Sequence, residues 1–517
     1  MIVETFLGKV RGRLENGVHA FKGIPYAAST EATNRFLPPQ PALPWAGIRE
    51  AETFGKSSPQ VHVESPLTRW YGAIEPIGED CLSLNVFTPV ASTSASKPVM
   101  VWLHGGGWWV YSGSAPGLNG TNLAKFGDVV VVTVNHRLGL FGYIKLDDAD
   151  DRFADSGSAG VLDLVAALRW VGDNIAAFGG DPANVTVFGH SGGGAKVSTL
   201  MATPAAKGLF HKAIAQSCSG SLRHAGQEEA AAMTRGLSSQ LGLSRPTGEA
   251  LQAVPLDRLL AAYARASGFF RPIIDGRALT RDPFDPDAPA LSSAIPFMVG
   301  NTAAETRLTL AGDRRNFFLD SEEVHRRIGR FLRVDARETS RIVDAYQTAA
   351  PVANPSDILA AVTTDYAYIR NTRREATLQA DAGGGPVYAY LFKWRTPAWD
   401  NLLQSPHTAE VPFVFGTAPA AAELVGSGVE IASLTRMMIA TWSAFARTGS
   451  PGNPTVPFWP QYNSKDRFTM LLDVRSHVEP DPGGVTRASL DRLPFFEYRM
   501  PQNYAQPSRA STGAGPG

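Results

Sequence analysis

The chain has 517 residues, of which 44% are hydrophobic and 19% charged, a composition typical of a soluble globular protein with a large core. Its 48 Lys and Arg residues balance its 48 Asp and Glu residues, and this zero net charge argues against nucleic acid as a partner, which needs a basic surface. No run approaches the roughly 20 apolar residues that a membrane span requires.

The N-terminus shows no secretory leader. Residues 1–5 lack a basic stretch followed by an apolar one, so we expect no signal peptide in this chain. A cytosolic location and the earlier removal of a leader, as in a secreted or periplasmic protein, both stay open. Cys81 and Cys218 can form at most one disulfide, so no disulfide framework is expected.

The first half of the chain shows strands that alternate with helices. Residues 99–103 form an apolar run that glycines end, and residues 129–134 are β-branched throughout, as in a central strand covered on both faces. Residues 159–178 carry apolar side chains at helical spacing, and short strands follow at 185–188 and 213–216. This alternation predicts a mostly parallel sheet with helices on both faces.

The second half is richer in helical patterns, chiefly between residues 225 and 382. Because strand-like runs return within and after this stretch, we interpret it as a helical excursion over the catalytic edge of one sheet. We therefore expect a single elaborated α/β domain over residues 1–506 and a disordered tail over residues 507–517, which have almost nothing to bury. The expected helices are 321–332, 335–348, 370–382 and 434–447, and the expected strands are 297–299 and 387–392.

Residues 189–193, Gly-His-Ser-Gly-Gly, fit the G-x-S-x-G pattern of a nucleophile elbow. The pattern alone is weak, but here a β-branched strand enters it and a small-residue segment leaves it toward a helix. Such a turn places Ser191 at the carboxyl edge of the sheet near a helix N-terminus, which favours developing negative charge. The alternative is a Gly/Ser-rich turn without chemistry.

A second glycine-rich segment, residues 104–107 (His-Gly-Gly-Gly), directly follows a strand. It matches the loop that donates backbone N–H groups to an oxyanion, and the expected donors are Gly106, Gly107 and Gly192. A phosphate-binding loop is excluded because no Gly-Lys-Ser/Thr ending follows. We expect His104 to be a structural residue that packs under the loop.

The general base is sought among the histidines that follow Ser191, because the order in α/β hydrolases is nucleophile, acid, histidine. His407 lies in a loop with turn chemistry, whereas His325 falls in a charged helix and suits a solvated surface position. The pattern favours His407 without excluding the other histidines. It leaves the carboxylate open, because many are available.

Two longer segments extend the match beyond the elbow. They are residues 178–192, Phe-Gly-Gly-Asp-Pro-Ala-Asn-Val-Thr-Val-Phe-Gly-His-Ser-Gly, and residues 79–86, Glu-Asp-Cys-Leu-Ser-Leu-Asn-Val. Supporting segments are residues 21–27, 35–36, 135–142 and 453–460. Over about residues 4–498 the chain resembles type-B carboxylesterases, the group that includes cholinesterases and bacterial para-nitrobenzyl esterases. The resemblance implies an α/β-hydrolase fold and ester hydrolysis through an acyl-enzyme. We expect no cofactor and no metal, because no such motif is visible and the mechanism requires neither.

Carried over by position, the resemblance implies that Ser191 is the nucleophile, Glu305 the acid and His407 the base. Ser217 falls where the family keeps an accessory serine near the histidine. Two structural ion pairs are implied as well, Arg35 with Glu79 and Arg137 with Asp163.

Three departures from the family pattern are visible. His190 stands where relatives usually have glutamate, which argues against a cationic choline ester. Cys81 lacks its expected disulfide partner around residues 57–64, so we expect a free buried thiol. Arg223 and His224 replace the apolar or aromatic residues with which relatives often line the acyl pocket.

The residues that contact the substrate are less determined. Trp108 and Trp109 follow the oxyanion loop, where they either wall the pocket or pack in the core. Arg223, with His190 and His224, suits an acyl group with free carboxylates, such as the tricarballylate side chains that the similar bacterial fumonisin esterases remove. The alternative is a solvent-facing Arg223 in a broad small-ester carboxylesterase.

Two other functions share these features. A catalytically silent binding or adhesion member of the family would lack a triad member, whereas all three are present. An amidase would use the same triad and is not excluded by the residues. The expected partner is a small-molecule ester, residues 61–78 are a candidate lid, and the oligomeric state is not predicted.

Overall fold

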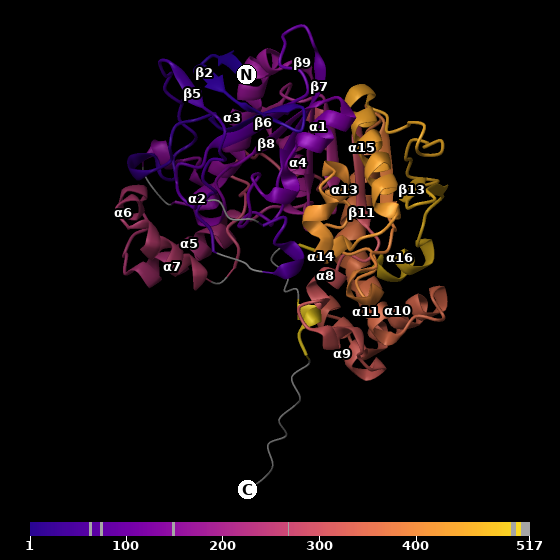
Figure 1. Cartoon of the computed structure of the whole chain (residues 1–517). Coiled ribbons are helices and arrows are strands. Elements are labelled where there is room, and N and C mark those ends of the chain that lie inside the picture. The colour runs from indigo at the N-terminus through magenta and orange to yellow at the C-terminus, as the bar shows by residue number, and fades with distance from the viewer. Residues whose placement is uncertain (62–64, 73–75, 147–149, 267, 498–502, 508–517) are drawn as a thin grey trace.

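The computed structural model describes residues 1–61, 65–72, 76–146, 150–266, 268–497 and 503–507. An 11-stranded sheet runs through this part of the chain (Figure 1). In spatial order its strands are β14 (His477–Glu479), β13 (Thr469–Leu472), β12 (Val387–Phe392), β11 (Phe297–Thr302), β10 (Lys212–Gln216), β9 (Gly180–His190), β7 (Lys97–Leu103), β8 (Val130–Val134), β6 (Ser83–Thr88), β4 (Val18–Pro25) and β3 (Arg13–Glu15). Neighbours from β13 to β8 pair in parallel and the outer strands pair antiparallel, which confirms the expected mostly parallel sheet.

The remaining elements surround this sheet. A small sheet contains β1 (Ile2–Thr5), β2 (Gly8–Arg11) and β5 (Ile48–Glu50). The α-helices are α1 (Thr121–Gly127), α2 (Gly139–Tyr143), α3 (Ala159–Asn174), α4 (Gly192–Ala202), α5 (Gln227–Leu241), α6 (Gly248–Gln252), α7 (Leu256–Ala264), α8 (Arg307–Leu310), α9 (Ser321–Leu332), α10 (Ala336–Ala349), α11 (Pro355–Thr364), α12 (Arg370–Asp381), α13 (Val411–Phe415), α14 (Ala422–Val425), α15 (Glu430–Thr448) and α16 (Gly484–Leu490). A π-helix, η10 (Asp365–Ile369), joins α11 to α12.

Both faces of the large sheet are covered, as the side chains of β7 show. Val99, Val101 and Leu103 belong to the core that contains α3 and α4 residues, whereas Met100 and Trp102 belong to the core under α15. Successive side chains of a strand point to opposite faces. A strand buried on both faces therefore reads as a continuous apolar run, which is how β7 and β8 could be predicted from the sequence.

Helices α5 to α7 and α9 to α11 form two groups (Figure 1), whereas α12 packs against β11 and β12 of the large sheet. Helices α5 to α7 lie beside α2, and helices α9 to α11 lie under the C-terminal half of the sheet. Helix α8, which directly follows β11, lies on this same side, so the two groups lie toward the carboxyl ends of the parallel strands. Strands β11 and β12 return the chain to the one large sheet.

Some boundaries differ from the predictions. The helix expected over residues 159–178 ends as α3 at Asn174 and continues as a 3₁₀ turn over Ile175–Phe178, which Gly179 ends with a φ of 83°. The strand expected over residues 185–188 is longer, because β9 begins at Gly180, which pairs with Lys97 of β7 across a register shift.

Two expectations fall on the limits of the described chain. Apart from Pro507, the expected tail lies outside the described residues, as do residues 62–64 and 73–75 of the candidate lid.

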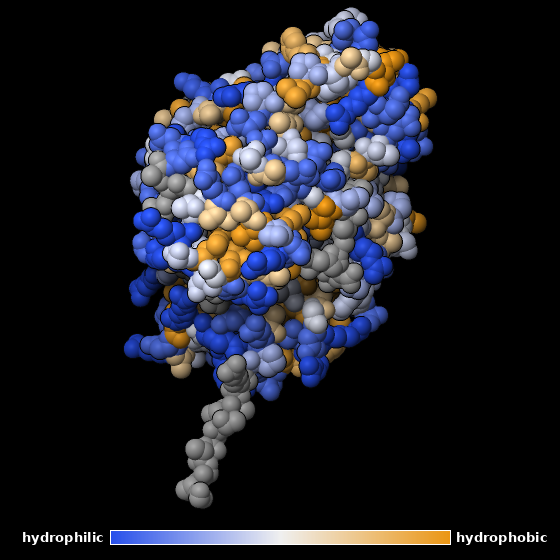
Figure 2. Space-filling model, turned by 90° about the vertical axis from the view of Figure 1, so that its left-hand side faces the viewer, coloured by the Kyte–Doolittle hydropathy of each residue, from blue (hydrophilic) through white to orange (hydrophobic). Residues whose placement is uncertain are grey.

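The face seen in Figure 2 is mainly hydrophilic, with hydrophobic side chains gathered in small patches. Within the described residues, no helix combines the length and the apolar character that crossing a membrane would need.

The two ion pairs that the resemblance implies are present and buried. Arg35 Nε lies 2.5 Å from Glu79 Oε1, and an Arg137 guanidinium nitrogen lies 2.6 Å from Asp163 Oδ1. Cys81 is a free buried thiol, and burial raises its pKa to about 12. Removing one partner of either ion pair would leave an uncompensated buried charge.

Candidate active site

Ser191 lies at the sharp turn between β9 and α4. Its φ of 59° and ψ of −123° are strained for a residue with a side chain, and its N–H donates to the Gln216 carbonyl at 2.7 Å. Two residues further on, the backbone at Gly193 packs closely against the end of β7. A Cβ on Gly193 would lie 1.9 Å from the Leu103 carbonyl oxygen. The turn therefore presents a partly exposed Ser191 at the carboxyl end of the sheet.

Glu305 and His407 are joined across the loops that follow β11 and β12. His407 Nδ1 lies 2.6 Å from Glu305 Oε2, and the His407 N–H donates to the Glu305 carbonyl at 3.2 Å. The other carboxylate oxygen accepts from the Thr302 N–H at 2.9 Å and from Asn301 Nδ2 at 3.2 Å. The Glu305 side chain is fully buried and that of His407 is 12% exposed. An Nδ1–H that donates to the carboxylate leaves Nε2 as the accepting nitrogen of the neutral ring.

His407 lies beside the turn that carries Ser191. Its ring centroid is 4.4 Å from that of His190, the residue before Ser191, and 5.1 Å from that of Tyr368. No hydrogen bond joins Ser191 Oγ to His407 among the residues that the structure describes. In free enzymes such contacts often tighten only when substrate binds.

The glycine-rich segment over residues 104–107, the expected oxyanion loop, lies directly against the start of α4. Gly106 and Gly107 have φ values of +82° and +61°, in the left-handed region that favours glycine. A Cβ on Gly192 would lie 2.1 Å from the Gly107 carbonyl oxygen, so the two backbones touch. The three expected N–H donors are therefore brought into one region by contact between the loop and the helix.

Lys196 is a residue of this region that the sequence reasoning missed. It is fully buried in α4, its Nζ donates to the His104 carbonyl at 2.8 Å, and it lies 5.5 Å from the ring centroid of Trp108. Burial lowers the pKa of its ammonium well below the usual value. His104 itself is buried under the loop and stacks on His136 at 4.9 Å. The sequence feature that could have indicated Lys196 is a single lysine in a helix of mainly small and apolar residues.

His190 is fully buried, and the described residues give neither of its ring nitrogens a hydrogen-bond partner. Burial, and then the neighbouring His407, lower its pKa well below the usual value. Its Nε2 lies 3.9 Å from Glu410 Oε1, which accepts from Gln216 Nε2 at 3.2 Å. Burial raises the pKa of Glu410 to about 8, so both members of this pair are mainly uncharged at neutral pH. Glu410, three residues after His407, was not singled out from the sequence.

Ser217 begins the loop after β10. Its φ is 51°, and its N–H donates to the Gly300 carbonyl at 2.7 Å. Within the described chain, its buried Oγ has no hydrogen-bond partner.

Of the two tryptophans, Trp108 is fully buried in the core, with its ring 5.9 Å from that of His224. Trp109 is half-buried and stacks on Phe269 at 4.3 Å. His224 Nε2 lies 3.0 Å from Thr199 Oγ1, and burial lowers the His224 pKa to about 3. His224 is therefore neutral, and Trp108 is buried among core residues.

Arg223 lies at the surface with its side chain 48% exposed. Its guanidinium forms ion pairs with Asp285 and with Glu497, the latter at 2.8 Å. The two carboxylates compensate the positive charge of Arg223. The expectation of a substrate with free carboxylates rests on that charge.

The order of the large sheet and the strand–turn–helix around Ser191 define an α/β-hydrolase fold. The sequence model of the carboxylesterase family matches residues 1–483, and the chain belongs to that family. It is therefore a carboxylic-ester hydrolase, and the resemblance seen in the sequence is confirmed.

Characterised relatives cover nearly the whole chain. The para-nitrobenzyl esterase of Bacillus subtilis (strain 168) is 35% identical over 510 residues, which are 95% of this chain and 98% of that protein. Phenmedipham hydrolase of Pseudarthrobacter oxydans is 32% identical over 91% of this chain and 94% of its own length. The crystal structure of the Geobacillus stearothermophilus carboxylesterase Est55 at pH 6.2 aligns with a TM-score of 0.83 and 38% identity, covering 94% of this chain and 99% of that one.

Proposed function

We propose that the protein is a serine esterase in which Ser191, Glu305 and His407 form the catalytic triad. The observation that carries the proposal is the 2.6 Å contact between His407 Nδ1 and the buried Glu305, beside the turn that presents Ser191. This contact orients the imidazole so that Nε2 can take the Ser191 proton.

The reaction proceeds through an acyl-enzyme. Ser191 Oγ attacks the ester carbonyl carbon as its proton passes to His407 Nε2, and Glu305 stabilises the imidazolium that forms. The alcohol leaves with that proton. Water then loses a proton to His407 and attacks the acyl carbon, and the acid departs as Ser191 recovers its proton.

The N–H groups of Gly106, Gly107 and Gly192 hold the oxyanion. The contact between Gly192 and the Gly107 carbonyl supports this role, because it aligns the loop with the N-terminus of α4. The unpartnered hydroxyl of Ser217 suits the accessory position near the histidine.

The substrate class we propose is small uncharged esters. The pKa values of His190 and His224 are lowered and that of Glu410 is raised, so these groups bring little charge near neutral pH. Relatives named para-nitrobenzyl esterase and phenmedipham hydrolase agree with uncharged substrates. A tricarballylate ester would require Arg223 to leave its two carboxylates, so we place it second.

The test compares kcat/KM for para-nitrophenyl butyrate, a tricarballyl ester and the anilide matched to the butyrate, in the wild type and in Arg223→Ala. We expect the butyrate to be preferred, the anilide to react at least ~100-fold more slowly, which corresponds to about 2.7 kcal/mol, and Arg223→Ala to leave both ester rates unchanged. Arg258→Ala, at an exposed position of α7, is the matched control. A tricarballyl preference that Arg223→Ala abolishes would establish the polycarboxylate substrate, and a faster anilide would indicate an amidase.

A further inference from the structure

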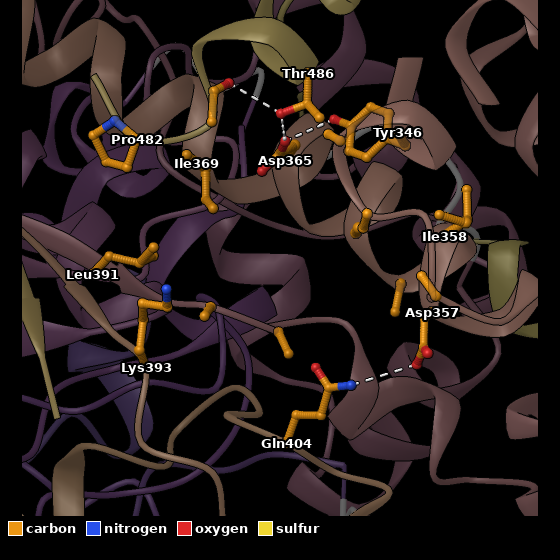
Figure 3. Close-up of a pocket in the computed structure, with 18 of the residues that line it drawn as sticks. Tyr346, Asp357, Ile358, Asp365, Ile369, Leu391, Lys393, Gln404, Pro482 and Thr486 are labelled. Carbon is orange, nitrogen blue, oxygen red and sulfur yellow. Dashed lines mark hydrogen bonds between the residues drawn. The ribbon is translucent and has the colours of Figure 1, made fainter. Parts of the chain in front are cut away.

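A cavity of about 620 Å³ lies between α10, α11, η10 and the ends of β12 and β13 (Figure 3). Its volume falls in the range of roughly 300–1,000 Å³ that is usual for small-molecule sites. Ser191, Glu305 and His407 are absent from the described residues that line it. It is therefore separate from the proposed catalytic centre.

Much of the lining is small and apolar. Alanines come from residues 303–304, 349–353 and 360–361, and Ile369 and Leu391 add larger apolar surface. Because alanine side chains are short, they leave space next to apolar walls. This part of the cavity suits the apolar body of a ligand.

The carboxylates in the lining already have partners. Asp357 pairs with Arg307 and Asp365 accepts from the Tyr346 hydroxyl at 2.7 Å, as Figure 3 shows for the latter pair. Glu479, the third carboxylate, lies 3.0 Å from the Nε2 of His477.

Two cations of the lining, Lys393 and Arg395, follow β12 and are exposed. A third, Arg373 of α12, donates to the Pro482 carbonyl, and its charge is attracted by Asp365 and Asp481. Within the described chain, neither Lys393 nor Arg395 makes a direct ion pair with a carboxylate, so the cavity carries two cations that can pair with an anion. Carboxylates bound by such groups form charge-assisted hydrogen bonds.

Three segments connect the cavity to the proposed triad. Ala303 and Ala304 line the cavity and immediately precede Glu305. Gln404 lines it as well, and the neighbouring Ser405 carbonyl accepts from the Ala304 N–H at 2.9 Å.

The π-helix η10 is the third connection. Ile369 faces the cavity, whereas the preceding Tyr368 places its ring 5.1 Å from that of His407. Short π-helical segments frequently occur at functional sites. A ligand in the cavity thus contacts the same backbone segments that position Glu305 and His407.

We propose that this cavity binds a small organic carboxylate with an apolar body, and that its occupancy lowers turnover through the segments that carry Glu305 and His407. The binding half of the proposal is independent of the proposed function. The effect on turnover rests on it, and the acids that an esterase releases belong to this ligand class.

The experiment titrates octanoate into the full-length protein by calorimetry, after a small fluorophosphonate has capped the nucleophile. The same titration uses the neutral probe octanamide. The variant Lys393→Ala/Arg395→Ala removes two cations from the cavity, and Lys207→Ala/Arg258→Ala makes the matched charge change at exposed positions elsewhere. Thermal unfolding checks that both variants are folded.

We expect one octanoate per capped chain, binding about tenfold weaker in the cavity variant and unchanged in the control, as two partly exposed charge pairs predict. In the uncapped wild type, saturating octanoate should lower kcat for para-nitrophenyl acetate about fivefold or more, the usual size of allosteric coupling. An acid that only occupied the catalytic pocket would instead raise KM.

The proposal is overturned if octanoate does not bind the capped protein, if octanamide binds equally well, or if the cavity variant keeps full affinity. A bound octanoate that leaves kcat unchanged overturns the effect on turnover, and the binding data stand even if Ser191 proves not to be the nucleophile.

Discussion

Replacing Glu305 by glutamine tests how the buried carboxylate acts, because the surrounding donors dictate how the new amide must lie. Glu305 Oε1 accepts from the Thr302 N–H and from Asn301 Nδ2. In Glu305→Gln the amide oxygen must occupy this position, since an NH₂ group there would face two donors. The amide NH₂ then faces His407 Nδ1.

This arrangement reverses the histidine tautomer. His407 Nδ1 must accept from the amide, so the ring proton moves to Nε2, which can no longer take a proton from Ser191. The variant also loses the charge that stabilises the imidazolium. In serine proteases the equivalent Asp→Asn change lowers kcat about 10,000-fold, or about 5.5 kcal/mol, and we expect a similar loss here.

The assay is steady-state hydrolysis of para-nitrophenyl butyrate by Glu305→Gln. KM should change little, because the proposed role of Glu305 does not involve contact with the substrate. Glu228→Gln, at an exposed position of α5, is the matched control and should keep full activity. A loss of less than about tenfold (about 1.4 kcal/mol) in a folded variant would refute the reasoning.

Three further predictions concern groups around the site. Gly192→Ala should lower kcat/KM by about 100- to 1,000-fold, the cost of one oxyanion donor, because the new Cβ displaces the Gly107 carbonyl; unchanged kinetics would contradict the contact. Lys196→Met should lower kcat about tenfold (about 1.4 kcal/mol) with no loss of thermal stability, since it removes the anchor of the oxyanion loop together with a poorly solvated ammonium. Glu375 is buried beside Ser198 and Ser221, and burial raises its carboxyl pKa to about 7. The folded state thus holds its proton more tightly than the unfolded chain, and this contribution to stability is lost as pH rises from about 4.5 to 7. Glu375→Gln should remove that loss, by up to about 1.4 kcal/mol per pH unit in denaturant titrations; parallel curves for variant and wild type would show that Glu375 stays ionised.

Sequence patterns predicted those elements whose physical cause lies within a short stretch of the chain. The runs that became β7 and β8 are apolar because both faces of the strands are covered, and the glycine at 193 is required by a backbone contact at the same turn. The end of α3 was misplaced because the 3₁₀ turn over Ile175–Phe178 keeps a helical spacing of apolar residues.

Contacts between distant segments could not be derived from spacing. Glu305 and His407 are 102 positions apart, and only the family resemblance singled out this carboxylate. Arg223 could be read as a free cation because Asp285 and Glu497 are distant in the sequence. For the same reason the proximity of His190 to Glu410 was not foreseen, since the two residues are distant in the sequence.

The most direct test of Ser191 as the nucleophile is stoichiometric labelling with a fluorophosphonate, followed by mass mapping of the labelled peptide. We predict one label per chain, carried by Ser191, with ester hydrolysis lost in proportion to labelling. Ser191→Ala should take up no label and lose at least a thousandfold in kcat, or about 4 kcal/mol. A label on another residue, or a Ser191→Ala protein that still hydrolyses esters, would contradict the proposed mechanism.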